Sequence, residues 1–189
     1  GLAFVIFGLL VGSARRILLD EVAGLQARRR RETGLMAWSW TLGALVFLQI
    51  LSGALVAGLD AGRGHVDWPL MEGSFLPPES FDLQPVWHNV FENPALAQFN
   101  HRMIGYAILV FAILFAWRAG RSGVVAVRRW ANAALAVVLV QVVLGIVTVM
   151  NAAPLGLALA HQATALALVV VLLRARFEIA YPAAQRITA

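Results

Sequence analysis

Four long apolar runs constrain this chain more than any other feature of its sequence. Each is long enough to cross a bilayer, for which a helix needs about 20 apolar residues. The runs occupy residues 36–59, 95–117, 130–150 and 155–173. The composition agrees, because 60% of the 189 residues are hydrophobic and only 13% are charged. We therefore predict an all-α, polytopic membrane protein built as a four-transmembrane-helix bundle.

Three segments follow from these runs. Residues 1–34 are expected to hold the end of a truncated transmembrane helix, of which 1–12 is the apolar part, and an arginine-rich connector. Residues 35–174 form the membrane bundle with a long outer loop at 60–94, and 175–189 form a tail. The chain has no cysteine, which excludes disulfides and thiolate metal sites.

The arginines predict the orientation. They flank the apolar runs at Arg15, Arg16, Arg28, Arg29, Arg30, Arg31, Arg118, Arg121, Arg128, Arg129, Arg174, Arg176 and Arg186. By the positive-inside rule, the first connector, the connector between the second and third runs, and the C-terminus are cytoplasmic. The acidic 60–94 loop is then periplasmic. This grouping explains the net charge of +5 better than nucleic-acid binding does.

The outer loop is unusually long for a bare connector. Apolar residues recur at helical spacing over 83–91, which predicts a short amphipathic helix on the membrane surface. An irregular loop is the alternative. We expect His65 and His88 of this loop to be solvated, although His88 beside Trp87 could also lie over a cofactor edge.

An internal repeat divides the four runs into two hairpins. The first and third runs share Q-x-x-x-G, with Gln49 and Gly53 matching Gln141 and Gly145. Each following run carries one histidine, in "FNHRM" and "LAHQA". We expect the two glutamines to form interhelical hydrogen bonds rather than cofactor contacts.

The two histidines match in depth. His101 and His161 each follow a proline, Pro94 and Pro154, by seven residues. Because proline favours the first turn of a helix, each histidine should lie about 10 Å below the outer surface. Two neutral imidazoles at equal depth can ligate one haem iron from opposite sides.

Residues around the histidines agree with this hypothesis. Gly53, Gly145 and Gly105 would let a flat macrocycle approach the backbone, and Arg102 could pair with a propionate. A histidine in a membrane helix also commonly hydrogen-bonds its neighbour, and glycines commonly mark helix packing. A zinc or copper site is disfavoured because no suitable third ligand is found at that depth.

Several longer motifs resemble one family. "FENPALAQFNHRMIGY", "DWPLMEGSFLP", "LQILSGALVAGLDAG", "QVVLGIVTV" and "LALAHQATA" closely resemble haem A synthase, in the form found in alphaproteobacteria and mitochondria. The resemblance implies eight transmembrane helices in two similar halves, of which this chain is the C-terminal one, in the bacterial inner membrane. "GHVDWP" departs from the "NTWP" of the family, which leaves the roles of His65 and Asp67 open.

The resemblance also implies chemistry. His101 and His161 would axially ligate a haem b, while the N-terminal half holds the haem O substrate and a catalytic glutamate. We therefore assign no catalytic residue here. The family oxidises a methyl group of haem O to the formyl group of haem A for cytochrome c oxidase assembly. We expect that these 189 residues alone do not complete that reaction.

The expected partners are haem O through the other half, an unidentified electron donor and membrane lipid. Nucleic acid is not expected, and homo-oligomerisation is left open. Two other functions also remain open. One is a stand-alone membrane cytochrome b that relays electrons, and the other is a structural assembly subunit without a cofactor.

Overall fold

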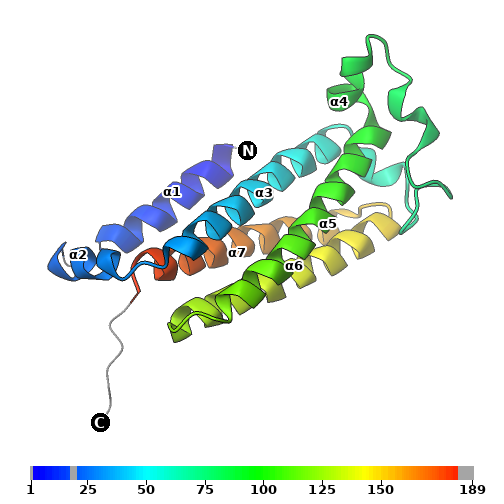
Figure 1. Cartoon of the computed structure of the whole chain (residues 1–189). Coiled ribbons are helices and arrows are strands. Elements are labelled where there is room, and N and C mark those ends of the chain that lie inside the picture. Colours follow the sequence, from blue (N-terminus) through cyan, green and yellow to red (C-terminus); the bar gives the residue numbers. More distant parts are fainter. Residues whose placement is uncertain (1, 18–20, 183–189) are drawn as a thin grey trace. The chain divides into compact units, whose positions relative to one another are not determined.

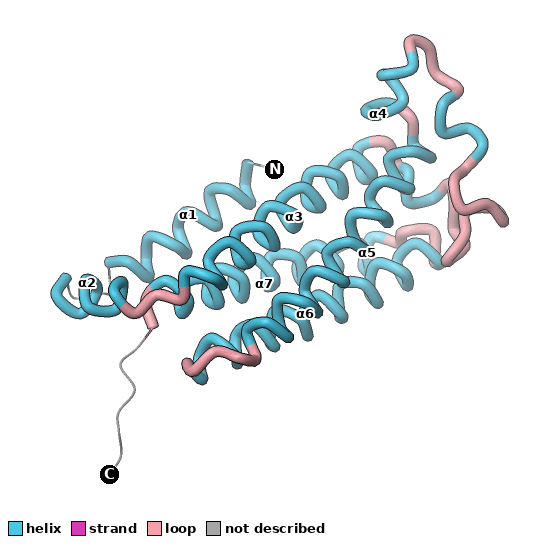
Figure 2. Tube along the Cα trace, viewed as in Figure 1, coloured by secondary structure: helices cyan, strands magenta, loops and turns pink. Residues whose placement is uncertain are grey.

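The structure is a computed structural model that describes residues 2–17 and 21–182. Gly1, residues 18–20 and residues 183–189 of the predicted tail, with Arg186, lie outside the described part. Within that part the regular secondary structure is helical, apart from one isolated β-bridge between Met71 and Ser74 (Figure 2). The predicted all-α class is confirmed.

Four helices are long and apolar enough to cross a membrane (Figure 1). They are α3 (Thr33–Gly58), α5 (Pro94–Ala119), α6 (Val125–Met150) and α7 (Leu155–Ala180). Large apolar side chains on all four are exposed, including Phe47, Val110, Val143 and Leu159. Exposed apolar surface on such helices suits contact with lipid, so the chain is a multi-pass membrane protein.

The two histidine-bearing helices begin at the predicted prolines. α5 starts at Pro94, and α7 starts one residue after Pro154. The carbonyl of Pro154 accepts a hydrogen bond from the Ala158 N–H at 3.0 Å. Both positions lie where the missing N–H of proline costs nothing, because the first N–H groups of a helix have no partner within it.

Two helices extend further than predicted. α6 begins at Val125 rather than at 130, and α7 continues past 173 to Ala180. Charged residues in the last turns of α7 are engaged, so they need not end the helix. Arg174 pairs with Glu178 four residues later, and the Arg176 guanidinium lies 3.8 Å from the ring centroid of Trp40.

The first segment is more helical than its arginine content suggested. It holds α1 (Leu2–Ile17) and a second helix, α2 (Glu21–Arg29), which was not predicted. In α2 an acidic residue occupies the first turn and Arg28 and Arg29 the last, and both placements favour the helix dipole.

The chain divides into two compact units. Each of the four candidate membrane helices contributes one of its ends to the first unit and the other end to the second. Among the described residues the first unit comprises 2–17, 21–44, 110–138 and 166–182, and its buried side chains include Leu42, Phe115 and Ile179. The second unit comprises residues 45–109 and 139–165, and it contains the outer loop and both intramembrane histidines.

The outer loop contains several short helical segments. These are η1 (Ala61–Arg63), η2 (Pro78–Phe81), η3 (Val86–His88) and α4 (Asn89–Glu92). The helix predicted over 83–91 is confirmed for the part that η3 and α4 cover. The buried Asn89 side chain supports this turn, because its amide bonds the backbone N–H and carbonyl of Leu83 and the carbonyl of Val86. The side chains of Trp87 and Phe91 are exposed, and their contact with a membrane surface stays a prediction.

Candidate functional site

The imidazole of His101 is held by Gln49 of α3. The Gln49 Nε2 donates to the His101 carbonyl oxygen at 3.0 Å and lies 3.2 Å from the His101 Nε2. The interhelical role predicted for Gln49 is therefore confirmed. The other ring nitrogen, His101 Nδ1, is buried and has no hydrogen-bond partner.

Two glycines make room for this pair. A Cβ atom at Gly53 would lie 3.1 Å from the His101 Cε1, closer than side chains normally approach. A Cβ atom at Gly105 would lie 3.3 Å from the Gln49 Nε2. Gly53 thus lies directly against the histidine, and Gly105 makes space for the glutamine amide.

His161 repeats part of this arrangement on the second hairpin. A Cβ atom at Gly145 would lie 3.3 Å from the His161 Cε1, so the repeat places a glycine against each histidine. The His161 Nδ1 is likewise buried and unpartnered. Both glutamines have a buried Oε1 without a partner, but Gln141 differs from Gln49 because the described residues show no bond from its side chain to α7. The interhelical bond predicted for Gln141 is not found there.

The two imidazoles belong to the same compact unit, one on α5 and one on α7. In the described part of the chain no cluster of three or more His, Cys, Asp or Glu residues could hold a bare metal ion. A haem supplies four nitrogen ligands itself and needs two axial ones. Two half-buried imidazoles, each with a buried, unpartnered Nδ1 and a glycine beside it, fit that requirement.

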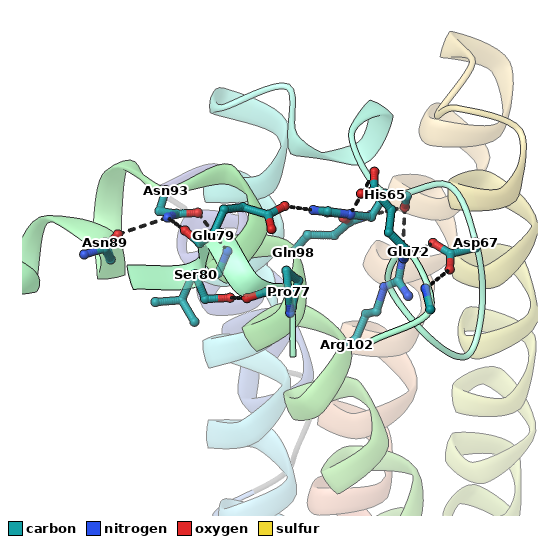
Figure 3. A network of polar contacts seen from close by, with 12 residues as sticks. His65, Asp67, Glu72, Pro77, Glu79, Ser80, Asn89, Asn93, Gln98 and Arg102 are labelled. Atoms are coloured by element: carbon teal, nitrogen blue, oxygen red, sulfur yellow. Dashed lines mark hydrogen bonds and ion pairs between the residues drawn. The ribbon is translucent and has the colours of Figure 1, made fainter. Parts of the chain in front are cut away.

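Arg102 reaches away from the helix into the outer loop (Figure 3). Its Nη1 donates to the Leu70 carbonyl and its Nη2 to the His65 carbonyl, each at 3.0 Å. A guanidinium has five N–H donors, so these two bonds leave others for an acidic group. The outward direction predicted for Arg102 is observed, and its two hydrogen-bond partners are loop carbonyls.

Arg102 belongs to a stripe of three residues that we call the loop anchor: Gln98, Arg102 and Tyr106. These are spaced four apart and therefore share one face of α5. Gln98 Nε2 donates to the His65 carbonyl at 2.8 Å, and the Tyr106 hydroxyl accepts from the Trp68 Nε1 at 2.8 Å. The loop anchor fastens the segment 65–70 to the helix that carries His101.

The solvated position predicted for His65 is wrong, since this residue is only 6% exposed. Its Nε2 lies 2.8 Å from the Glu79 Oε1, and its Nδ1 lies 3.6 Å from the Glu72 Oε1 (Figure 3). The Glu79 carboxylate therefore compensates for part of the lost hydration, whereas the buried Nδ1 has no hydrogen-bond partner. His88 is more open, with 30% side-chain exposure; its Nδ1 lies 3.4 Å from the Glu92 Oε2, and its ring contacts Trp87 edge-on.

Asp67 stabilises the tight turn at residues 72–73. Its carboxylate accepts the backbone N–H of Glu72 at 3.0 Å and that of Gly73 at 3.4 Å. The bond from Glu72 is the main reason that the pKa of Asp67 lies below its usual range, with smaller contributions from Gly73 and Arg102. The ionised form of Asp67 therefore stabilises the folded loop.

His65, Gln98 and Tyr106 were not selected from the sequence as site residues. The four-residue spacing of Gln98, Arg102 and Tyr106 is visible in the sequence and is the signal that could have revealed the loop anchor. The partner of that face could not be identified, because loop positions 65–70 have no helical or strand periodicity.

The chain that carries this site has clear relatives among known proteins. The family model described as COX15-CtaA, cytochrome oxidase assembly protein, matches residues 1–173. A haem A synthase of Ruegeria pomeroyi is 50% identical over 188 residues, which is 99% of this chain and 49% of that protein. The haem A synthase of Paracoccus denitrificans is 48% identical over 182 residues, 96% of this chain and 48% of that protein.

A third relative, the haem A synthase of Dinoroseobacter shibae, is 48% identical over 97% of this chain and 48% of its own length. The chain thus spans about half the length of the curated relatives it matches. No solved structure matches it.

Proposed function

Because the chain belongs to the COX15-CtaA family of cytochrome oxidase assembly proteins, we propose that it acts in haem A biosynthesis as the haem b-binding half of a haem A synthase. The observation that carries this proposal is the pair of half-buried imidazoles on two candidate membrane helices. Each has an unpartnered Nδ1, and each lies against a glycine of the preceding helix. A site of this composition suits a flat group that is inserted between helices and ligated from both faces.

The roles of the residues follow from their surroundings. His101 and His161 would hold the haem iron, and Gly53 and Gly145 would leave space beside each ring. Arg102 would pair one of its remaining N–H groups with a propionate while its two carbonyl bonds keep the guanidinium in place. When bound, a bis-histidine haem b supplies one-electron transfer.

Two structural elements tune this site before any ligand binds. Gln49 fixes the rotation of the His101 ring, and the loop anchor holds the outer loop to the next turn of the same helix. Both elements reduce the motion that ligand binding would otherwise have to arrest.

The whole reaction belongs to the longer protein. The relatives named as haem A synthases are about twice the length of this chain. We propose that the complete protein oxidises the haem O methyl group to a formyl group in the bacterial inner membrane. In that protein the 60–94 loop would be periplasmic and the C-terminus cytoplasmic. The other half would hold haem O, and an electron donor would supply this half.

A stand-alone cytochrome b that only relays electrons is the second candidate. It is favoured by one observation, namely that both histidines belong to a single unit of this chain. The two candidates differ in chemistry, since only the synthase consumes haem O. An assay of haem O conversion with and without a second four-helix half separates them.

Absorption and electron paramagnetic resonance spectra of the purified 189-residue chain, reconstituted with haem b, test the proposed site. We expect a low-spin, six-coordinate haem in the parent chain and its loss in His101→Ala and in His161→Ala. His88→Ala is the matched control, because it removes a histidine of the outer loop that belongs to neither hairpin helix.

A spectrum of low-spin haem that survives either intramembrane histidine substitution would contradict axial ligation by that residue. A chain that takes up no haem under any condition, while retaining its helical circular dichroism, would leave the structural assembly role as the better description.

A further inference from the structure

A cavity of about 270 Å³ lies in the first unit, whereas both intramembrane histidines belong to the second. It is formed where α3 begins and where α5 turns into α6. The lining residues that matter for its chemistry are Arg31, Glu32, Gly34, Arg118, Arg121 and Ser122.

The lining is strongly basic, with three guanidinium groups against one carboxylate. The carboxylate is already engaged, because Glu32 Oε1 accepts a hydrogen bond from the Ser122 hydroxyl. Ser122 is itself held by Arg128, whose Nη1 donates to the Ser122 carbonyl at 2.6 Å. The acidic group therefore anchors the wall of the cavity and is less available to neutralise the arginines.

The arginines that face the cavity lack acidic partners. Across the described residues, the side chains of Arg31 and Arg118 form no hydrogen bond or ion pair, and Arg121 stacks on the Trp117 ring at 3.6 Å. Three cations without counter-ions around one cavity repel each other and favour a bound anion.

The backbone contributes a further donor. Gly34 is the second residue of the 26-residue helix α3, and among the described residues its N–H has no hydrogen-bond partner. Gly34 also lies close to one of the arginines, since a Cβ atom there would be in van der Waals contact with the Arg118 Nη2 at 3.7 Å. The N-terminus of a long helix adds a partial positive charge to that of the arginines.

The position of the cavity suggests the source of the anion. α3 begins at Thr33 and α5 ends at Ala119, and both are candidate membrane spans. Trp40 and Trp117, near these ends, are 61% and 62% exposed, as expected for aromatic residues at a membrane–water interface. Basic pockets between transmembrane helices at this level bind lipid head groups.

We propose that this cavity binds a phosphate group, and that the group belongs to the head group of an anionic phospholipid. Arg31 and Arg118 contact the phosphate, Arg121 is held beside it by Trp117, and the Gly34 N–H points to the same oxygens. The site is separate from the histidine pair and needs no haem.

The test uses the purified 189-residue chain in an uncharged detergent, so that no anionic surface contributes. Short-chain phosphatidylglycerol, phosphatidylcholine with the same chains, and inorganic phosphate are titrated separately. Lipid retention by native mass spectrometry and the shift in thermal midpoint are measured. We expect saturable binding of phosphatidylglycerol and much weaker binding of phosphatidylcholine, whose choline balances the phosphate charge.

The variant Arg31→Gln/Arg118→Gln should bind phosphatidylglycerol about 25-fold more weakly, at about five-fold for each arginine. Arg29→Gln/Arg30→Gln is the matched control. It removes the same charge from the preceding turn, and neither residue lines the cavity. Helical circular dichroism of each variant confirms that the chain is folded, and Arg118→Lys should restore part of the affinity.

Equal losses in the two double variants, or unchanged binding in Arg31→Gln/Arg118→Gln, would overturn the site. Stabilisation by inorganic phosphate at the concentrations at which phosphatidylglycerol acts would overturn the lipid as the source of the phosphate group.

Discussion

The two hairpins of the second unit carry the same short motif but hold their histidines differently. In the first hairpin, Gln49 contacts both the ring and the carbonyl of His101. A Cβ atom at Gly53 would lie 3.1 Å from the Cε1 of the same ring. In the second, Gly145 repeats the close approach at 3.3 Å, but Gln141 makes no bond to the histidine helix among the described residues.

The connections differ as well. The first hairpin is closed by the long 60–94 loop, which the loop anchor ties to α5, whereas a short turn joins α6 to α7. One imidazole therefore has a hydrogen-bond partner and belongs to a helix to which the loop is fastened, whereas the other has no hydrogen bond among the described residues. An internal repeat can thus preserve histidine positions while only one copy acquires elements that restrain its histidine.

Filling the space beside each histidine should have the largest effect. Gly53→Ala and Gly145→Ala each place a methyl group within contact of an imidazole, at 3.1 and 3.3 Å. Overpacking of this kind costs about 1–3 kcal/mol. We expect the larger loss of haem affinity in Gly53→Ala, because Gln49 prevents His101 from moving aside. Haem titration followed in the Soret band measures both.

Gly43→Ala is the control for that pair, since a Cβ atom at this position of α3 meets nothing within 4 Å. It should leave haem affinity unchanged and slightly favour the helix. A larger loss in Gly145→Ala than in Gly53→Ala would show that the first histidine is not the more restrained one.

Removing the cation of the loop anchor should have the next largest effect. Arg102→Gln loses two charge-assisted bonds to loop carbonyls, and we expect segment 65–70 to open more easily by about 1–2 kcal/mol. Hydrogen exchange of the loop amides measures this opening. The exposed Arg63→Gln, which loses only an ion pair with Asp60, should change exchange little. Equal hydrogen exchange in both variants would show that the Arg102 bonds do not stabilise the loop.

The two glutamines should respond unequally to the same substitution. Gln49→Leu loses a hydrogen bond to His101 and should destabilise the chain by about 1 kcal/mol. Both substitutions remove a buried, unpartnered oxygen, but Gln141→Leu breaks no bond to the next helix among the described residues and should be neutral or stabilising. Unfolding in mixed micelles provides the comparison, and equal destabilisation would mean that Gln141 has a partner equivalent to that of Gln49.

The smallest expected effect is a pH dependence confined to the outer loop. The pKa of Asp67 is lowered in the folded chain, chiefly by the Glu72 N–H, so ionised Asp67 favours the folded loop. That contribution is fully present above the ordinary pKa of an aspartate, about 3.9, and is lost as the pH falls through the lowered value. The Glu72 amide signal in nuclear magnetic resonance should titrate in that range, and Asp67→Asn should abolish the titration. A titration midpoint above the ordinary pKa of an aspartate would show instead that the folded loop favours protonated Asp67.

Much of the architecture was predictable from local pattern. The apolar runs gave all four spans, and the prolines gave the outer ends of α5 and α7 to within a residue. The ends near arginines were less predictable, as at Arg174 and Arg176, because pairing with Glu178 and stacking on Trp40 depend on neighbours that a hydropathy pattern does not identify.

The candidate site shows the same division. The histidines and their companion glycines could be selected because their spacing repeats in the two hairpins. The burial of His65 could not, since it results from Glu79 and Glu72 of a loop without periodic sequence, together with bonds from Gln98 and Arg102.

The sequence by itself determined that this chain forms membrane helices, where two of them begin, and which polar residues lie inside them, because a bilayer core selects for length and apolar composition. Only the tertiary structure decided which of two matching histidines is restrained, and what Arg102 and His65 contact. Those outcomes depend on side-chain distances between segments far apart in the sequence, where a difference of a few tenths of an ångström determines whether a bond or a contact forms.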